Sequence, residues 1–88
     1  MILTPDEARI AIKDLSATES EVNDLIRASE QAIEDYIRYP LSDFEMIPYP
    51  LKLAAKFYCA SQHEYAMGWE KTFHNMCYPY RHLPTDVN

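Results

Sequence analysis

Hydrophobic residues recur at every third or fourth position along most of this chain, which is the spacing of one face of an α-helix. The longest such pattern spans residues 19–38, where charged residues occupy the opposite face. Its apolar stripe consists of Val22, Leu25, Ile26, Ser29, Ala32, Ile33, Tyr36 and Ile37. At 100° per residue the stripe covers an arc of roughly 140°, which predicts a helix packed on one side. Thr18 and Glu21 form a capping-box sequence at its start.

A similar start signal stands near the N-terminus. Thr4 precedes Pro5, and Glu7 follows Thr4 by three positions, which is a capping box with proline at the first helical position. The residues that then share one apolar face are Ala8, Ala11, Ile12 and Leu15. This pattern predicts a first helix over about residues 5–15.

Prolines divide the second half of the chain. Pro40 ends the second helix and begins an irregular connector, whose apolar residues we expect to pack against the core. These residues are Phe44, Met46, Ile47 and Tyr49. Beyond the connector we expect a third helix over about 50–67, which Gly68 ends in the left-handed conformation. A short helix over 70–78 and an extended tail over 79–88 complete the chain.

The third helix is expected to be the central one. Its apolar residues cover well over half of its circumference, which is typical of a helix packed by several neighbours. They are Leu51, Leu53, Ala54, Phe57, Tyr58, Ala60 and Tyr65. Only a narrow stripe of Lys52, Lys56 and His63 is expected to face outward.

Length and composition agree with a small helical fold. A chain of 88 residues is expected to form one domain. It contains a single glycine, which argues against a fold rich in tight β-hairpins. We therefore predict an all-α domain over 1–88, with three main helices, a short C-terminal helix and an extended tail.

The charge is acidic and uneven, with a formal net charge of −6. Residues 1–48 hold eleven acidic and four basic side chains, whereas residues 49–88 hold three and four. The first part is therefore a poor partner for nucleic acid, because phosphate binding needs clustered Lys and Arg. No signal peptide or membrane span is expected, and two cysteines are too few for a disulfide scaffold. A cytosolic, reducing setting is the default expectation.

Two Cys–His pairs raise the question of a zinc site. Cys59 and His63 lie one helical turn apart, and His74 and Cys77 follow. Their spacing is not that of a common zinc finger, and the two lysines of the third helix stand on the same side as Cys59 and His63. Because ammonium groups repel a divalent cation, we interpret Cys59 as a packing residue and expect no metal or other cofactor.

Catalytic motifs are missing from the sequence. It contains no nucleophile elbow, no phosphate-binding glycine loop and no HExxH motif. Lys56 near Cys59 suggests a lowered thiol pKa, but a thiol enzyme needs further groups. We therefore expect no enzymatic activity.

Aromatic and methionine residues point instead to protein contacts. Seven tyrosines, one tryptophan and four methionines are many for so small a core, and these residue types are favoured at interfaces. Four tyrosines stand beside prolines in expected connectors, namely Tyr39, Tyr49, Tyr78 and Tyr80. They either complete the core or contact a partner.

The order of several short motifs resembles the head–tail connector (adaptor) proteins of long-tailed bacteriophages. The matching segments are Leu3-Thr4, Glu7-Ala8, the acidic loop 14–21, Leu25-Ile26, Asp35-Tyr36-Ile37, Pro40-Leu41, Pro50-Leu51-Lys52, Ala54-Ala55 and Pro79-Tyr80-Arg81. The resemblance covers most of the chain. It departs in two places, since the family's longer insert before the last helix is here reduced to residues 69–72, and Met76 and Cys77 replace leucines.

This resemblance implies a structural virion protein of the neck region, assembled in the host cytoplasm. Family members form a ring, usually twelve-fold, between the portal protein and the next neck or tail-completion protein. The ring joins head to tail, and double-stranded DNA passes through it without specific binding. No membrane is involved.

Two sets of residues are candidate contacts under this interpretation. The uneven charge of the two parts of the chain suggests a contact between subunits. In it, Glu30 and Glu34 of one subunit meet Lys52 and Lys56 of its neighbour, with His63 beside them. The C-terminal segment is the candidate for portal docking, through Tyr78, Tyr80, Arg81 and Leu83.

Two other interpretations remain open. The chain fits a small helical adaptor or regulator of prophage origin that acts as a monomer or dimer. It also fits a zinc-stabilised helical module. Ring formation separates the connector interpretation from the adaptor, and bound metal identifies the zinc-stabilised module.

Overall fold

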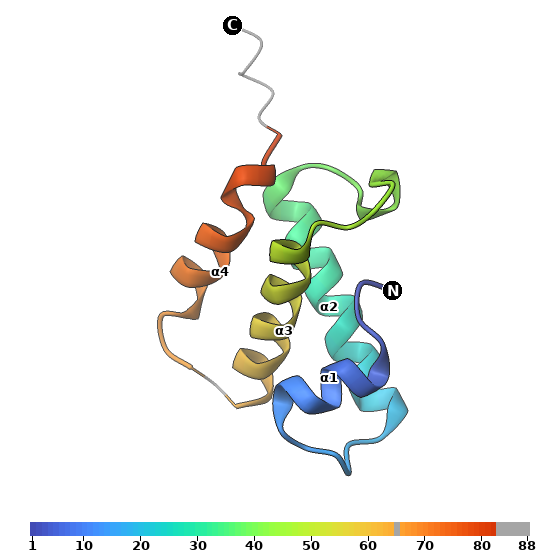
Figure 1. Ribbon diagram of the computed structural model, residues 1–88. Helices are drawn as coiled ribbons and strands as arrows, with labels where there is room; N and C mark the ends of the chain where they lie inside the picture. Colours follow the sequence, from blue (N-terminus) through green and yellow to red (C-terminus); the bar gives the residue numbers. More distant parts are fainter. Residues whose placement is uncertain (65, 83–88) are drawn as a thin grey trace, which may run out of the picture.

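The computed structural model describes residues 1–64 and 66–82 (Figure 1). Over these residues the chain forms four α-helices and two short 3-10 helices, with no strand. In chain order they are α1 (Pro5–Ile12), α2 (Glu19–Ile37), η1 (Leu41–Asp43), α3 (Tyr49–His63), α4 (Trp69–Cys77) and η2 (Tyr78–Tyr80). The predicted all-α fold is confirmed.

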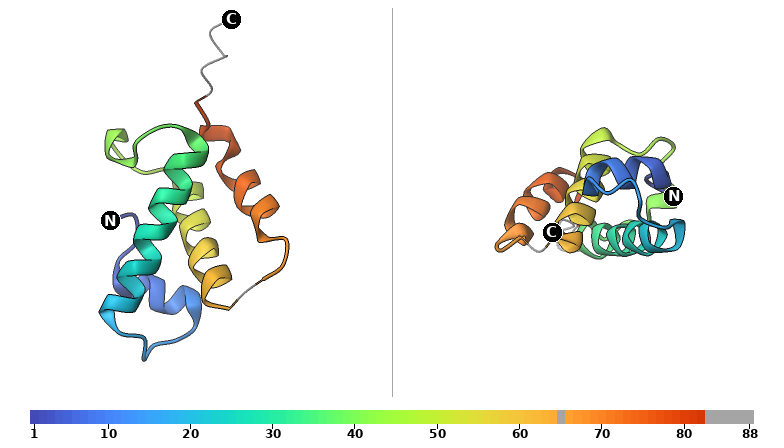
Figure 2. Two further views of the ribbon diagram at one scale, coloured as in Figure 1. Left: turned by 180° about the vertical axis from the view of Figure 1, so that it is seen from behind. Right: turned by 90° about the horizontal axis from the view of Figure 1, so that it is seen from below.

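Helix α3 lies at the centre of the bundle. It contacts α1, α2 and α4, which lie on different sides of it (Figures 1 and 2). Its buried side chains are mostly small, which lets the neighbouring helices approach closely. They are Leu51, Ala54, Ala55, Cys59 and Ser61. The expectation of a central third helix is therefore confirmed, although Leu53 is 38 % exposed and Tyr65 lies outside the described residues.

Helix α2 supplies four of the large apolar side chains of the core, beside Leu3, Leu51 and Phe73 from other segments. Its fully buried residues come from the predicted stripe and are Val22, Ile26, Ile33 and Ile37. Removing such a side chain from water contributes about 1.5–3 kcal/mol. Ser29 is buried in the same stripe, where its hydroxyl donates a hydrogen bond of 2.6 Å to the Ile26 carbonyl oxygen.

Both predicted capping boxes are present. The Thr4 hydroxyl accepts from the Glu7 amide at 3.1 Å, and the Glu7 carboxylate accepts from the Thr4 amide at 2.8 Å. Thr18 and Glu21 repeat the arrangement at 3.2 and 2.9 Å. Each box binds amide groups that the first turn of a helix leaves without partners.

The first helix is shorter than predicted, because it ends at Ile12 and not at residue 15. Lys13 adopts the left-handed conformation with φ 59°. The Asp14 carboxylate then accepts bonds from the Ser16 amide (3.1 Å) and hydroxyl (2.7 Å), which offers the backbone an alternative to the helix. Leu15 is consequently 77 % exposed, and its assignment to the apolar face was wrong.

The third helix also ends early, at His63, and the assignment of Gly68 to its end was wrong. Gly68 has φ 77° and immediately precedes α4. The chain reverses here, so that Trp69 packs edge-on against Tyr58 with ring centroids 5.3 Å apart. In one continuous helix these two residues would stand about 16 Å apart, since the rise is 1.5 Å per residue. Tyr58 and Trp69 both also contact Phe73.

The remaining boundaries agree with the sequence to within one residue, except in the tail. Residues 78–80 form η2, whereas an extended tail was predicted from residue 79. The segment 83–88 lies outside the described residues. The connector packs as expected through Phe44 and Ile47, but the expectation was wrong for Met46 and Tyr49, which are 84 % and 64 % exposed.

We expect Thr18→Ala to lower the free energy of unfolding by about 1 kcal/mol, because it removes the hydroxyl that caps α2. In a domain of this size this corresponds to a fall in Tm of about 4–8 °C. Urea or thermal unfolding followed by circular dichroism measures it. Thr72→Ala is the matched control, since Thr72 is exposed in α4. Equal effects of the two substitutions would contradict the capping role of Thr18.

Candidate interaction surfaces

Glu30 and Glu34, one turn apart on α2, bind two other segments of the chain. Glu30 Oε2 accepts a hydrogen bond of 2.7 Å from the amide of Ile2, 28 residues away. Glu34 Oε2 accepts one of 2.7 Å from the amide of Leu41. Hydrogen bonds to a charged carboxylate are stronger than those between neutral groups. These half-buried carboxylates therefore hold the N-terminal segment and the connector against α2.

A pocket of about 290 Å³ lies between these three segments. Its lining residues are Met1, Ile2, Glu30, Glu34, Leu41, Ser42 and Ile47. Within the described residues, the second oxygen of each carboxylate has no hydrogen bond, and neither carboxylate forms an ion pair. The pocket thus combines apolar walls with two free anionic acceptors.

Sequence analysis identified the two carboxylates but not the other walls of this pocket. Ile2 is buried although it precedes the first helix. Leu3 stands directly before the cap of α1, the position of a hydrophobic staple, which indicates burial of Leu3 but not of Ile2. No local pattern shows that the connector returns to the same place, because that depends on the bond between Leu41 and Glu34.

The lysines of the basic stripe lie near α1, so the expectation that the stripe faces outward was wrong for them, whereas His63 is exposed as expected. Lys52 and Lys56 are half-buried. The hydrogen bond from the Thr4 amide lowers the pKa of the Glu7 carboxyl, and the charges of both lysines lower it further. His63 Nε2 lies 3.7 Å from Asp14 Oδ2. The stripe therefore has acidic partners within its own chain.

The five residues of the predicted subunit interface consequently occupy two places. Glu30 and Glu34 face the N-terminal segment and the connector, whereas the basic stripe lies near Glu7 of α1 and Asp14 of the loop after it. Their contact between neighbouring subunits stays a prediction.

The C-terminal segment docks on the end of α2. Arg81 Nε donates a hydrogen bond of 3.0 Å to the Tyr36 carbonyl oxygen, and its guanidinium lies 4.6 Å from the centroid of the Tyr36 ring. His74 stacks on the same ring at 4.2 Å. The His82 amide donates to the Ile37 carbonyl oxygen at 2.6 Å. A cation and two donors thereby complete the C-terminal turn of α2.

The four residues predicted to dock on a portal differ in accessibility. Arg81 is occupied within its own chain, whereas Tyr78 is 61 % exposed. Tyr80 is half-buried against the core. Leu83 lies outside the described residues. Tyr78 is therefore the most accessible of the three that the structure describes.

Cys59 and Cys77 are free thiols buried in the core. Burial raises the pKa of each thiol to about 11, and for Cys59 a hydrogen bond with Ser29 opposes the rise. The suggestion that Lys56 lowers the pKa of Cys59 was therefore wrong. Residues 1–64 and 66–82 contain no group of three or more His, Cys, Asp or Glu side chains placed to hold a metal ion.

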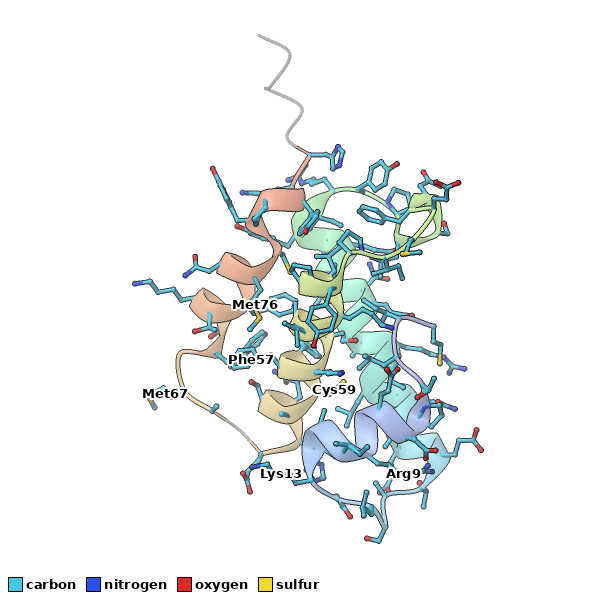
Figure 3. All side chains as sticks on the ribbon, in the orientation of Figure 1. Arg9, Lys13, Phe57, Cys59, Met67 and Met76 are labelled. Atoms are coloured by element: carbon cyan, nitrogen blue, oxygen red, sulfur yellow. The ribbon has the colours of Figure 1, made fainter. Side chains whose placement is uncertain are left out.

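Several large apolar side chains remain exposed in the described part of the chain. They are Met1, Ile10, Leu15, Met46, Tyr49, Leu53, Met67 and Tyr78. Figure 3 shows Met67 pointing away from the bundle, whereas Phe57 and Met76 lie between α3 and α4. Exposure of Ile10 agrees with its position off the apolar face of α1.

Comparisons with protein-family models, with curated proteins and with solved structures find no match. None of the helices in residues 1–64 and 66–82 is long and apolar enough to span a membrane.

We expect both cysteines to resist thiol reagents in the folded protein. At pH 8, raising the thiol pKa from 9.0 to about 11 lowers the thiolate fraction about a hundredfold, and burial limits access further. Labelling with dithionitrobenzoate, with and without urea, measures this difference. Rapid labelling without urea would contradict it, and the Cys59→Ala and Cys77→Ala variants identify the reacting thiol.

We expect Arg81→Ala to destabilise the protein by about 1–2 kcal/mol, because it removes a charged donor at the end of α2 and a cation over an aromatic ring. Arg81→Lys keeps the charge but loses the planar donor, so its effect should be smaller. Arg27→Ala is the control, since Arg27 is exposed on α2. Urea unfolding compares the three variants, and a loss for Arg27→Ala as large as for Arg81→Ala would refute the role of Arg81.

Proposed function

We propose that the chain is a subunit of a ring that connects the head of a long-tailed bacteriophage to its tail. The ring lies between the portal and the next neck or tail-completion protein, and DNA passes through it. The proposal rests on the order of motifs that the chain shares with head–tail connector proteins. An all-α bundle is the fold that this resemblance implies.

One observation supports the proposal more than the others. Two of the motifs that carry the resemblance, 35–37 and 79–81, are far apart in the sequence but in contact in the structure. Arg81 binds the carbonyl oxygen of Tyr36 and covers its ring. The presence of both motifs in one family is easier to understand when the two motifs form one structural unit. Here that unit is the contact of Arg81 with Tyr36 at the C-terminal end of α2.

The surface fits assembly with other protein chains. A ring requires a heterologous interface, in which one face of each subunit meets a different face of the next. The chain presents exposed Met46 on the connector and exposed Tyr78 after α4, which are residue types favoured at interfaces. In such a ring the acidic surface of α2 would allow DNA to slide, because it forms no phosphate contacts.

A small helical adaptor, monomeric or dimeric, is the second candidate function. The observation that favours it is the position of the basic stripe beside acidic residues of its own chain. The charges of Lys52 and Lys56 lower the pKa of Glu7, and His63 lies 3.7 Å from Asp14. A stripe that lies beside acidic groups of its own chain is less available to a neighbour.

Native mass spectrometry of the purified chain over a range of concentrations separates the two. The connector proposal expects a closed ring of about a dozen copies at high concentration. A chain that remains a monomer or dimer at every concentration would contradict self-assembly and favour the adaptor. The same spectra show any bound zinc as added mass.

A further inference from the structure

The pocket beside Glu30 and Glu34 has the chemistry of a site for a basic side chain. Glu30 and Glu34, each with one oxygen that accepts no hydrogen bond among the described residues, line it together with the apolar Ile2, Leu41 and Ile47. Lysine and arginine combine a cationic end with an apolar stem and match such a site. Since a water molecule takes roughly 30 Å³ of the liquid, the pocket of about 290 Å³ has room for the end of one long side chain.

Of the eight Lys and Arg side chains, two are hydrogen-bonded within the chain and two more are half-buried. Arg9 Nε binds the Ala17 carbonyl oxygen at 2.8 Å, and its guanidinium also pairs with Asp6. Arg81 is bound to the end of α2. The two lysines of α3 are half-buried near Glu7. The exposed cations are Lys13, Arg27, Arg38 and Lys71.

Of these four, Lys71 is the one on the edge of the molecule opposite to the pocket. Arg27 stands on α2, about 60° from Glu30 around the helix, and Arg38 caps the C-terminal end of α2. Lys13 ends α1. Lys71 belongs to α4, which lies across α3 from the N-terminal segment and the connector in every view of Figures 1 and 2. Subunits of a ring meet through two different faces, so a cation on the far edge is the one that can meet the pocket.

The outer face of α4 offers a second matching feature. Lys71, Asn75 and Tyr78 follow one another at helical spacing and are all exposed, whereas Phe73 and Cys77 point to the core. In the connector, directly before Ile47 of the pocket wall, Met46 is 84 % exposed. A neighbour's Tyr78 would therefore cover an apolar side chain close to the point where its Lys71 meets the carboxylates.

We propose that Lys71 of one subunit enters the pocket of the next and binds the free oxygens of Glu30 and Glu34. The proposal rests on the ring proposed above and assigns its repeating contact. It replaces Lys52 and Lys56 by Lys71 as the partner of the two carboxylates, because the α3 lysines already face α1.

A double-mutant cycle tests this contact. Glu34→Gln keeps an acceptor for the Leu41 amide but removes the charge, and Lys71→Gln removes the opposite charge. We expect each variant to raise the concentration needed for half-assembly by at least about tenfold. We expect the double variant to raise it no further, because both substitutions remove the same contact. Lys13→Gln is the control for the loss of one exposed charge, and Lys56→Gln tests the alternative partner.

Native mass spectrometry gives the assembled fraction, and thermal unfolding at low concentration checks that each subunit folds. A zero-length carbodiimide cross-link between subunits, mapped from Lys71 to Glu30 or Glu34, would support the proposal. Rings that tolerate Lys71→Gln, or coupling of Glu34 to Lys56, would overturn it and leave the connector function standing. A wild-type chain that forms no ring overturns both.

Discussion

Two carboxylates of α2 hold together parts of the chain that no regular hydrogen-bond ladder connects. The bond from Ile2 to Glu30 fixes the segment that leads into α1. The bond from Leu41 to Glu34 fixes the connector that leads into α3. These two bonds fix where the segments that lead into α1 and α3 meet α2, while apolar packing places the helices themselves around the core. The same carboxylates form the floor of the one acidic pocket described above.

The bundle built on these anchors has two unlike edges. Helix α3 lies in the middle, and α4 lies on the side away from the N-terminal segment (Figure 2). The edge with the pocket is acidic and partly apolar, and the edge formed by α4 carries an exposed lysine and tyrosine. Unlike edges are what a heterologous assembly requires, whereas a two-fold dimer uses one surface twice. The shape of the subunit and the proposed ring are therefore consistent.

Much of the fold could be predicted from the sequence, because local patterns of residues determine most of the helices. The caps at Thr4 and Thr18 act within three residues, and the apolar stripe of α2 repeats within one turn. The error at the end of α1 came from local bonds of Ser16 to the Asp14 carboxylate, whereas the error at Gly68 came from a contact between two helices. Gly68 starts α4 because Trp69 packs back on Tyr58, and no local rule contains that contact.

The candidate site shows the same division. The sequence indicated that acidic and basic faces exist, and that α2 carries the acidic one. It could not show that α1 covers Lys52 and Lys56, because the packing of α1 on α3 decides this. Nor could it show that Arg81 returns to Tyr36 across 45 residues, which removes it from the set of free cations.

The most direct measurement is an NMR titration of the amide protons of Ile2 and Leu41 in the monomer as the carboxylates are protonated by acid. If Glu30 and Glu34 accept these bonds, both amide resonances will shift together with the side-chain carboxyl signals. Glu30→Gln should then abolish the shift of Ile2 and leave that of Leu41 intact. Amide resonances that do not shift when Glu30 and Glu34 are protonated would contradict the anchoring role of α2. They would also contradict the pocket on which the proposed contact between subunits depends.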